Sequence, residues 1–448
     1  MNIRFTPTST PMTTIVRGVA AAAALCCASL AQAQVPAPGV TLYGLADVGI
    51  TSVSGLKAGT VTQVASGIME GSRWGMKGNE DLGGGYKAIF TLESRVELDT
   101  GSNSNTPISG SQLSDRYSNA ARLGLPASFS PLLPPTQAIL TGATGNGGLV
   151  ASLASQVYGV NVGPFGNRAF DRQAFVGLIT PVGAVLAGRM YTPAFETNAM
   201  FDVMEAQSGL AAGQIVSFPS LLEIRKSNSV AYRIAKDGLA GSLFYSLGDS
   251  GEAANDASKL VGFNASYKTG LFAVGMAYNA SKNELGQDSL KTTILGASMT
   301  MDAHKVTFMA WQNTDNNPSN MTLIGAQLVA GGLPGGVATA IQTAYTNALK
   351  QDGRLYHVGY RYTTGPHTIS AAYNTFNDQR PSNADVKSYG AAYTYALSKR
   401  TDLNAVLVRY DNGDNGQAAP GGNGYLGGVT ASAGTDSTGL ALGIRHRF

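Results

Sequence analysis

The stretch VTLYGLADVGI, residues 40–50, has the pattern that decides the fold. Its apolar residues fall mostly on even positions, whereas Tyr43 and Asp47 lie between them on odd positions. A period of two is that of a β-strand with one apolar face. Similar runs recur down the chain and predict an all-β protein of sixteen strands, at residues 40–51, 72–80, 85–98, 171–179, 184–191, 228–235, 238–247, 259–268, 271–281, 289–300, 304–312, 354–362, 367–376, 386–396, 401–410 and 437–448.

The connections between these runs alternate between short and long. The short ones are NEDLGG, TPVG, AKDG, KTG, MDAH, TTGP and LSKR, and the connections between them are long and variable. Tight turns at one end and long loops at the other are typical of an outer-membrane barrel. A barrel in a membrane must close, because an open sheet edge would leave backbone groups unpaired in hydrocarbon. The sequence therefore predicts a 16-stranded antiparallel transmembrane β-barrel.

Tyrosines share the predicted lipid-facing parity in two late strands, as expected of the girdles at membrane interfaces. They are Tyr356, Tyr360, Tyr362, Tyr389, Tyr393 and Tyr395. A soluble periplasmic β-sandwich would pack the same residues in its core, and this alternative stays open. A helical membrane protein is excluded, because nothing after Leu30 approaches eighteen consecutive apolar residues.

The first residues have the features of a cleaved signal peptide, predicted at 1–33. A basic front precedes an apolar run at 18–30, which is too short to span a bilayer, and an Ala-Gln-Ala cleavage site follows. Residues 34–448 then form a single barrel domain, exported to the bacterial outer membrane. Both Met1 and Met12 fit as the start of the chain.

Composition excludes several classes of function. The two cysteines, Cys26 and Cys27, lie in the predicted signal peptide, so the remaining chain has no disulfide and no thiolate metal site. Without Arg4 and Arg17 of that peptide, 29 of the 31 basic residues face 28 acidic ones, which indicates no nucleic-acid partner. The four histidines have no metal-ligand spacing, and no nucleophile or phosphate-binding motif follows a strand. We therefore expect no catalytic residues, no metal, no cofactor and no enzymatic activity.

One long connection differs from ordinary surface loops. The stretch YTPAFETNAMFDVMEAQSGLAAGQIVSFPSLLEIRKSN, residues 191–228, mixes apolar residues with acids and shows no strand alternation. It is too apolar for a solvated loop and too interrupted for one helix. We predict that it folds back into the barrel and narrows a passive pore. Long surface loops leave an outer-membrane adhesin or barrel enzyme as the alternative function.

The last strand, TGLALGIRHRF, ends the chain on an aromatic residue, with Arg445 and Arg447 on the face opposite its apolar residues. Together with other segments it resembles the Gram-negative general porin family, in the branch found in neisserial and burkholderial-type bacteria. The segments are VTLYGLADVG at 40–49, SRWGMKGNEDLGGGYKAIFTLES at 72–94, RQAFVGL at 172–178, GRMYTP at 188–193, LSKRTDL at 397–403 and GIRHRF at 443–448.

The resemblance implies a homotrimer of sixteen-stranded barrels in outer-membrane lipid. Each barrel would hold a water-filled channel for ions and small hydrophilic solutes, narrowed by an inward-folded third loop. It also implies that Phe448 is read by the outer-membrane insertion machinery. The stretch 99–171 is much longer than the second loop of the family, which often latches onto a neighbouring subunit. A further long surface loop, 313–353, has an alanine-rich part of unassigned role.

Strand parity and this resemblance predict the charges at the constriction. Parity places Arg73, Arg95 and Arg233 on the inner wall together with two acids, Glu93 and Glu97, and it adds Arg225 if the strand after the loop extends back to that residue. Similarity to the RQAFVGL strand adds Arg172, so the predicted wall arginines are Arg73, Arg95, Arg172, Arg225 and Arg233. The loop supplies the opposing carboxylates, Glu196, Asp202 and Glu205. The parity of Arg189 is not fixed by the pattern, and a position at the rim fits it equally. Because wall cations outnumber loop anions, we predict a weak preference for anions.

Overall fold

A computed structural model describes residues 39–103, 107–110, 112–141, 168–215, 223–248, 258–421 and 427–448. The predicted signal peptide, 1–33, lies outside these residues. In this part of the chain no helix is both long and apolar enough to cross a membrane.

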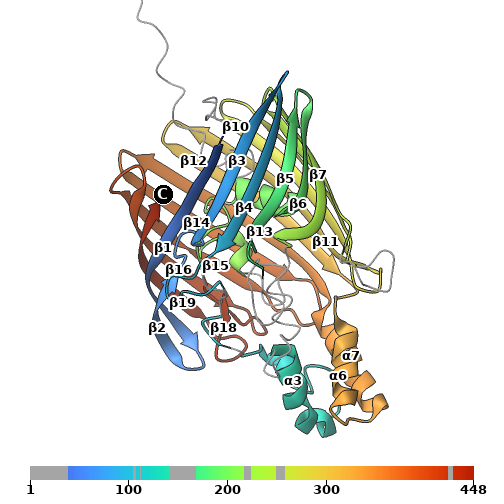
Figure 1. Ribbon diagram of the computed structural model, residues 1–448. Coiled ribbons are helices and arrows are strands. Elements are labelled where there is room, and N and C mark those ends of the chain that lie inside the picture. Colours follow the sequence, from blue (N-terminus) through green and yellow to red (C-terminus); the bar gives the residue numbers. More distant parts are fainter. Residues whose placement is uncertain are drawn as a thin grey trace, which may run out of the picture. The chain divides into compact units, whose positions relative to one another are not determined.

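Sixteen antiparallel strands of the described chain form the wall of a closed barrel (Figure 1). Closure is made by the first and last strands, which pair from Leu45 with Arg447 to Val53 with Gly439. The wall strands are β1 (Gly39–Leu56), β3 (Arg73–Gly83), β4 (Tyr86–Arg95), β5 (Gln173–Thr180), β6 (Gly183–Tyr191), β7 (Arg225–Lys236), β8 (Leu239–Ser246), β9 (Leu260–Lys268), β10 (Phe272–Lys282), β11 (Asp288–Met301), β12 (His304–Asp315), β13 (Gln351–Thr364), β14 (His367–Asp378), β15 (Val386–Ala396), β16 (Thr401–Asn412) and β19 (Ser437–Arg447). Each coincides with one predicted strand, so the predicted barrel is confirmed.

A further strand, β2 (Gly59–Ser66), was not predicted. It pairs with the C-terminal part of β1, from Val48 to Leu56, whereas β3 pairs with the N-terminal part, from Gly39 to Leu45. Its sequence, GTVTQVAS, has two valines spaced by three residues among polar ones, so it lacks the apolar alternation that marks the wall strands. Two-residue strands β17 (Ala418–Ala419) and β18 (Gly428–Val429) pair with each other outside the wall.

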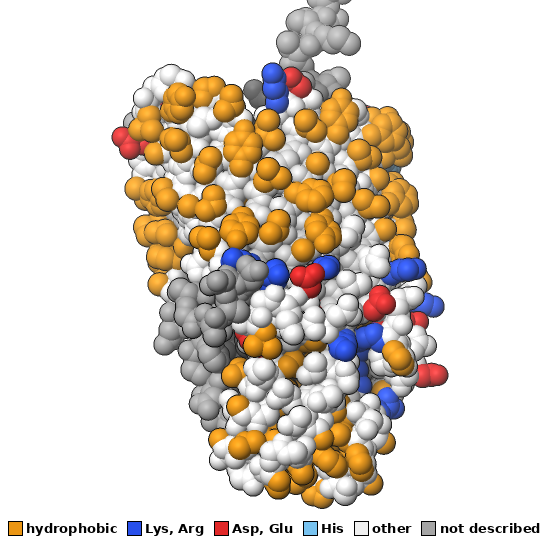
Figure 2. Space-filling model, turned by 90° about the vertical axis from the view of Figure 1, so that its right-hand side faces the viewer, with side chains coloured by type: hydrophobic (Ala, Val, Ile, Leu, Met, Phe, Trp, Pro, Cys, Tyr) orange, Lys and Arg blue, Asp and Glu red, His pale blue; other side chains and the backbone are white. Residues whose placement is uncertain are grey.

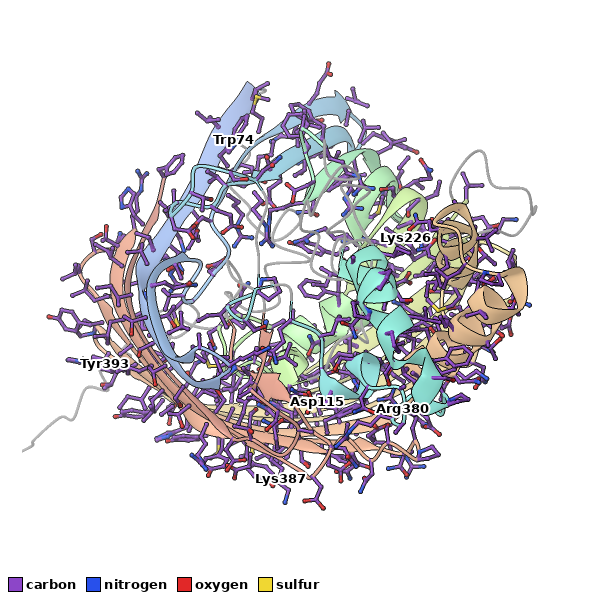
Figure 3. All side chains as sticks on the ribbon, turned by 90° about the horizontal axis from the view of Figure 1, so that it is seen from below. Trp74, Asp115, Lys226, Arg380, Lys387 and Tyr393 are labelled. Carbon is purple, nitrogen blue, oxygen red and sulfur yellow. The ribbon has the colours of Figure 1, made fainter. Side chains whose placement is uncertain are left out.

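The two faces of the wall differ as the alternation predicts. Side chains of one parity are exposed and apolar or aromatic, such as Leu42 (62% exposed) and Tyr389 (40%). Figure 2 shows a broad band of hydrophobic side chains on the barrel surface, with charged side chains at one of its borders. Seen from below, Tyr393 and Lys387 lie on the outside of the wall (Figure 3). The outside of the barrel is therefore suited to lipid.

The two longest surface loops contain helices that pack on each other. Residues of α2 (Asp115–Ser118) and α3 (Leu133–Thr141), together with the intervening η1 (Ala127–Leu132), share one apolar cluster with α6 (Met321–Ala330) and α7 (Gly335–Leu349). The hydroxyl of Tyr345 donates to the carbonyl oxygen of Tyr117 at 2.6 Å, and both side chains are buried. Figure 1 shows these helices beyond the end of the barrel opposite the tight turns.

The described part of the second loop is also tied to other loops of its own chain. Asp115 accepts a hydrogen bond from the backbone N–H of Ala433 at 3.0 Å, and its own N–H donates to Gln417 at 2.7 Å. Arg116 lies 3.8 Å from Asp378 at the end of β14. Residues 112–141 therefore brace the surface loops of the same barrel.

Candidate channel constriction

The third loop begins with a short helix, α5 (Pro193–Phe201), directly after β6. Thr192 caps it, because its hydroxyl accepts from the N–H of Phe195, and Pro193 fits the first helical turn, where no N–H is needed. The helix ends on Phe201, which is fully buried against inner-facing glycines of β10 and β11. A Cβ at Gly296 would lie 2.2 Å from the Phe201 ring, so only glycine leaves room for this contact.

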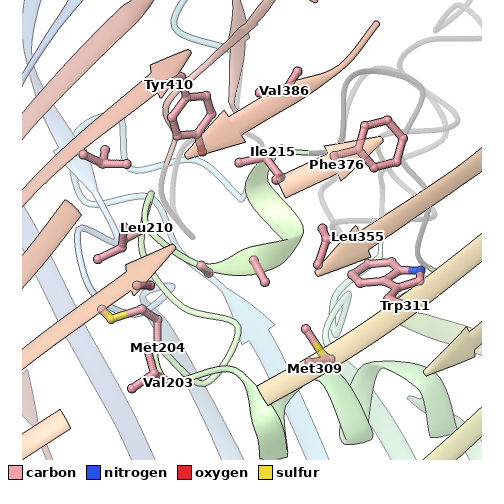
Figure 4. Close-up of a cluster of buried hydrophobic side chains, with 14 of the residues drawn as sticks. Val203, Met204, Leu210, Ile215, Met309, Trp311, Leu355, Phe376, Val386 and Tyr410 are labelled. Carbon is pink, nitrogen blue, oxygen red and sulfur yellow. The ribbon is translucent and has the colours of Figure 1, made fainter. Parts of the chain in front are cut away.

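Beyond α5 the loop covers an apolar part of the inner wall. Val203, Met204, Leu210 and Ile215 are all buried, and they face wall side chains of β12 to β16 (Figure 4). These wall residues are Met309, Trp311, Leu355, Phe376, Val386 and Tyr410. The described part of the loop, 192–215, thus lies against the inside of the barrel, whereas 216–222 are outside the described residues.

A buried histidine and asparagine hold both ends of the loop's inner turn. The N–H of Val203 donates to Nε2 of His357 at 3.1 Å, so this nitrogen is an acceptor and Nδ1 carries the proton. Nδ1 then donates to Oδ1 of Asn374 at 2.6 Å, and the amide of Asn374 donates to the carbonyl of Leu210 at 3.1 Å. The turn is thereby fixed to β13 and β14.

Three predicted wall arginines meet on the opposite side of the lumen. Arg172, just before β5, forms an ion pair with Glu93 at 2.7 Å and donates to the hydroxyl of Tyr191 at 3.1 Å. Arg225 donates to the same hydroxyl at 3.0 Å, and its guanidinium lies 4.5 Å from the centre of that ring. Arg73 lies within electrostatic range of Glu93. The structure therefore brings Arg73, Arg172 and Arg225 together near Glu93.

The remaining predicted arginines lie elsewhere on the wall. Arg233 of β7 forms an ion pair with Glu196 of α5 at 2.5 Å, so this pair joins wall and loop. Arg95 pairs at 3.0 Å with Glu97, near the long-loop end of β4. Arg189 donates to the carbonyl of Asp171 at 2.6 Å and is buried, which places it against the wall beside β5.

The loop acids have different surroundings. Glu205 pairs at 2.6 Å with Arg361, which also donates to the carbonyl of Val203. Arg361 was not predicted as a constriction residue. Strand parity could have found it, because Tyr360 and Tyr362 on either side of it face outward and Arg361 therefore faces inward. Asp202 is fully buried, and its oxygens accept from the N–H groups of Met204 and Ala212, each at 2.9 Å. It closes the loop turn.

A second group of inner charges was not among the predicted constriction residues. The carboxylate of Asp47 accepts three backbone N–H groups, from Ile68, Met69 and Glu70, and so folds the turn after β2 inward. Glu70 then binds Arg73 and lies 3.2 Å from Arg445 of β19. The turn shows no period in sequence, so no signal pointed to Glu70.

Asp402 of β16 completes this second group. It accepts from Arg445 at 3.0 Å and from Arg447 at 2.9 Å. The carboxylates of Glu70, Glu93 and Asp402 form ion pairs, whereas that of Asp47 accepts from backbone N–H groups. The two groups together contain five arginines, which are Arg73, Arg172, Arg225, Arg445 and Arg447. The lumen next to β1, β3 and β19 therefore has a slight excess of positive charge.

A closed antiparallel barrel with an apolar outer face, and with an inner loop and opposed charges within, is a membrane channel of the porin type. A sequence model of the Gram-negative porin family matches residues 18–415, and the chain belongs to this family. An outer membrane porin protein of Bordetella pertussis is 25% identical over 438 residues, covering 91% of this chain and 94% of that protein. The chain is thus an outer-membrane porin, whose barrel forms a water-filled channel.

Solved structures share the fold. An anion-selective porin from Comamonas acidovorans superimposes with a TM-score of 0.62 at 20% sequence identity, covering 92% of this chain and 99% of that one. An outer membrane protein of Vibrio cholerae, folded in vitro and in its trimer form, gives a TM-score of 0.56 at 12% identity, covering 92% of this chain and all (100%) of the other.

Proposed function

We propose that the channel passes ions and small hydrophilic solutes by passive diffusion with a weak preference for anions. The observation that carries this is the gathering of Arg73, Arg172 and Arg225 near Glu93, where three guanidiniums face the two carboxylates of Glu93 and Glu70. A fixed positive charge at the narrow part of a pore lowers the energy of a passing anion and raises that of a cation. The anion-selective porin from Comamonas acidovorans, which has the same fold, supports the same sign.

The other predicted constriction residues add little net charge to the pore. Arg233 with Glu196 and Arg95 with Glu97 are matched pairs, so they add local polarity and little net charge. Glu205 is matched by Arg361. Asp202 acts through the shape of the loop, because its carboxylate is bonded to the loop's own backbone.

The proposal includes a homotrimer and no enzymatic role. Leu42 on β1 and Leu442 on β19 expose apolar side chains to the outside beside the closure of the barrel, and such a surface is suited to a contact with a second copy. The Vibrio cholerae protein of the same fold is known in a trimer form. The helices of the two longest loops pack on each other, which accounts for the length of these loops without an adhesive or catalytic function.

Planar-bilayer recording tests the function directly. The purified protein is expected to insert with conductance steps in groups of three, and its reversal potential in a potassium chloride gradient is expected to have the sign of an anion-preferring pore. Protein unfolded by boiling is the control and should give no steps. Stable insertion without conductance, or a cation-preferring reversal potential, would contradict the proposal.

Deletion of Phe448 is expected to leave the protein in the periplasm. Its backbone N–H and C=O both bond to Gly44 of β1, at 3.1 and 3.0 Å, so this residue completes the seam between the last and first strands. Membrane fractionation after export measures the effect, and Phe448→Tyr, which keeps an aromatic end, is the matched control. Normal membrane levels of the deletion variant would remove Phe448 from the proposed insertion signal.

A further inference from the structure

Three of the four histidines lie on the outside of the barrel wall, at the end next to the tight turns. His304 begins β12, His367 begins β14 and His446 lies near the end of β19, and all three are exposed. His304 has the strand parity of the exposed Phe308, and His367 that of the exposed Ile369. Short turns lie on the periplasmic side of outer-membrane barrels, so these histidines lie at the periplasmic border of the lipid-facing band.

His304 is held by two tyrosines of the next strand, β13. Its Nδ1 lies 2.7 Å from the hydroxyl of Tyr360, and its ring centre lies 4.9 Å from that of Tyr362. If the hydroxyl of Tyr360 donates to Nδ1, the ring proton is on Nε2; if Nδ1 donates instead, the hydroxyl keeps its own proton to donate elsewhere. With either tautomer, this exposed pair of side chains has one N–H or O–H donor left for a ligand.

His367 repeats this arrangement two strands further along the wall. Its Nδ1 lies 2.7 Å from the hydroxyl of Tyr393 on β15, and its ring centre lies 5.2 Å from that of Tyr395. Figure 3 shows Tyr393 on the outside of the wall. His446 differs, because its Nδ1 lies 2.9 Å from the hydroxyl of Thr401 and not from a tyrosine. The rim next to the tight turns therefore has two donor groups of the same construction.

The tight turns beside the two histidines carry more positive than negative charge. Lys399 and Arg400, both exposed, lie in the turn between β15 and β16. This turn follows the end of β15 at which Tyr395 pairs with His367. Asp302 is the one acid of the turns 302–303, 365–366 and 397–400, and it lies just before β12. His367 therefore has the more positive surroundings of the two histidines.

We propose that each of the two pairs, His304 with Tyr360 and His367 with Tyr393, binds the phosphate of one phospholipid in the periplasmic leaflet. Lipid covers the outer face of an outer-membrane barrel, so a lipid headgroup is what meets an exposed donor at this border. Hydrogen bonds to an ionised acceptor are roughly twice as strong as neutral ones, which favours the phosphate. The pairs lie two strands apart, about 10 Å, so each takes its own phosphate. The site is outside the channel and does not depend on the proposed ion preference.

Native mass spectrometry tests the site by counting bound lipids. Protein stripped of lipid in detergent is titrated with dioleoyl phosphatidylglycerol, and dioleoylglycerol, which has the same acyl chains and no phosphate, is the comparison. Two phosphatidylglycerol molecules per barrel are expected to bind about tenfold more tightly than dioleoylglycerol, the effect of one hydrogen bond to a charged group. Equal binding of the two lipids would overturn the proposal.

Substitution of the histidines should remove the tight sites one at a time. H304F and H367F keep an aromatic ring and remove the imidazole nitrogens, so each should lose one of the two tightly bound lipids and H304F/H367F should lose both. H367F should lose the tighter one, because the turn with Lys399 and Arg400 lies beside His367. An unchanged number of tightly bound lipids in these variants would overturn the proposal.

Two tyrosine variants complete the test. Y232F/Y267F is the matched control, because it removes the hydroxyls of exposed tyrosines on β7 and β9, at the same end of the barrel, and it should keep both tight sites. If H304F/H367F does not assemble, Y360F/Y393F takes its place and should weaken both sites, because the imidazoles lose the hydroxyls that hold them. Loss of the tight sites in the control as well would assign them to rim tyrosines in general and overturn the role of the histidines.

Discussion

Replacing Arg73, Arg172 and Arg225 together with glutamine is expected to shift the permeability of the channel toward cations by roughly five- to tenfold. A unit charge acts on an ion about 4 Å away with roughly 1 kcal/mol in water and more in a partly desolvated pore, and 1.4 kcal/mol is a factor of ten. The reversal potential in a potassium chloride gradient measures the shift directly. Its size should exceed that of any single substitution, because the three guanidiniums lie together on the inner wall near Glu93.

A companion variant separates selectivity from misfolding. Arg172 and Glu93 are both buried and form an ion pair at 2.7 Å, so removal of the arginines alone leaves a buried carboxylate without its partner. Adding Glu93→Gln removes that carboxylate and should restore assembly while keeping part of the shift. Arg409→Gln, at an exposed position on the outer face, is the matched control and should leave the reversal potential unchanged. No shift in either constriction variant would place the three arginines away from the ion path.

Excision of Val203–Ala211 from the third loop is expected to raise single-channel conductance by roughly twofold and to admit larger solutes, because a sixteen-stranded barrel is wide enough to need filling. The structure shows where the cut can be made. The carboxylate of Asp202 bonds to the N–H of Ala212 at 2.9 Å, so the two ends already meet and two glycines can join them. Conductance and the uptake of sugars of increasing size into liposomes measure the result.

The excised segment also covers apolar wall side chains such as Met309 and Leu355, so its removal should lower thermal stability as well. Tyr410→Phe is the matched control, since it removes the hydroxyl that donates to the carbonyl of Gly209 and leaves the loop in place. Its conductance should equal that of the unmodified protein. An unchanged conductance after the excision would mean that the segment does not limit the pore.

Local patterns in the sequence determined the wall of this protein. A strand between lipid and a polar lumen must alternate, and this alternation located each of the sixteen wall strands and the outward direction of residues such as Leu42 and Tyr389. The same parity placed Arg73 and Arg233 inside. Parity also predicts that Arg361, Arg445 and Arg447 point inward, because the face on which a side chain lies follows from its position in the strand.

Tertiary structure alone decided which residues of the third loop contact the wall and how the surface loops pack on each other. The third loop has no period, so nothing local distinguishes Asp202, which bonds to its own backbone, from Glu205, which pairs with the wall. Glu70 reaches Arg445, 375 residues away, and Tyr345 reaches Tyr117, 228 residues away. Such contacts exist only once the sheet has closed and brought distant strands and loops to one place, and the pattern of neighbouring residues carries no trace of them.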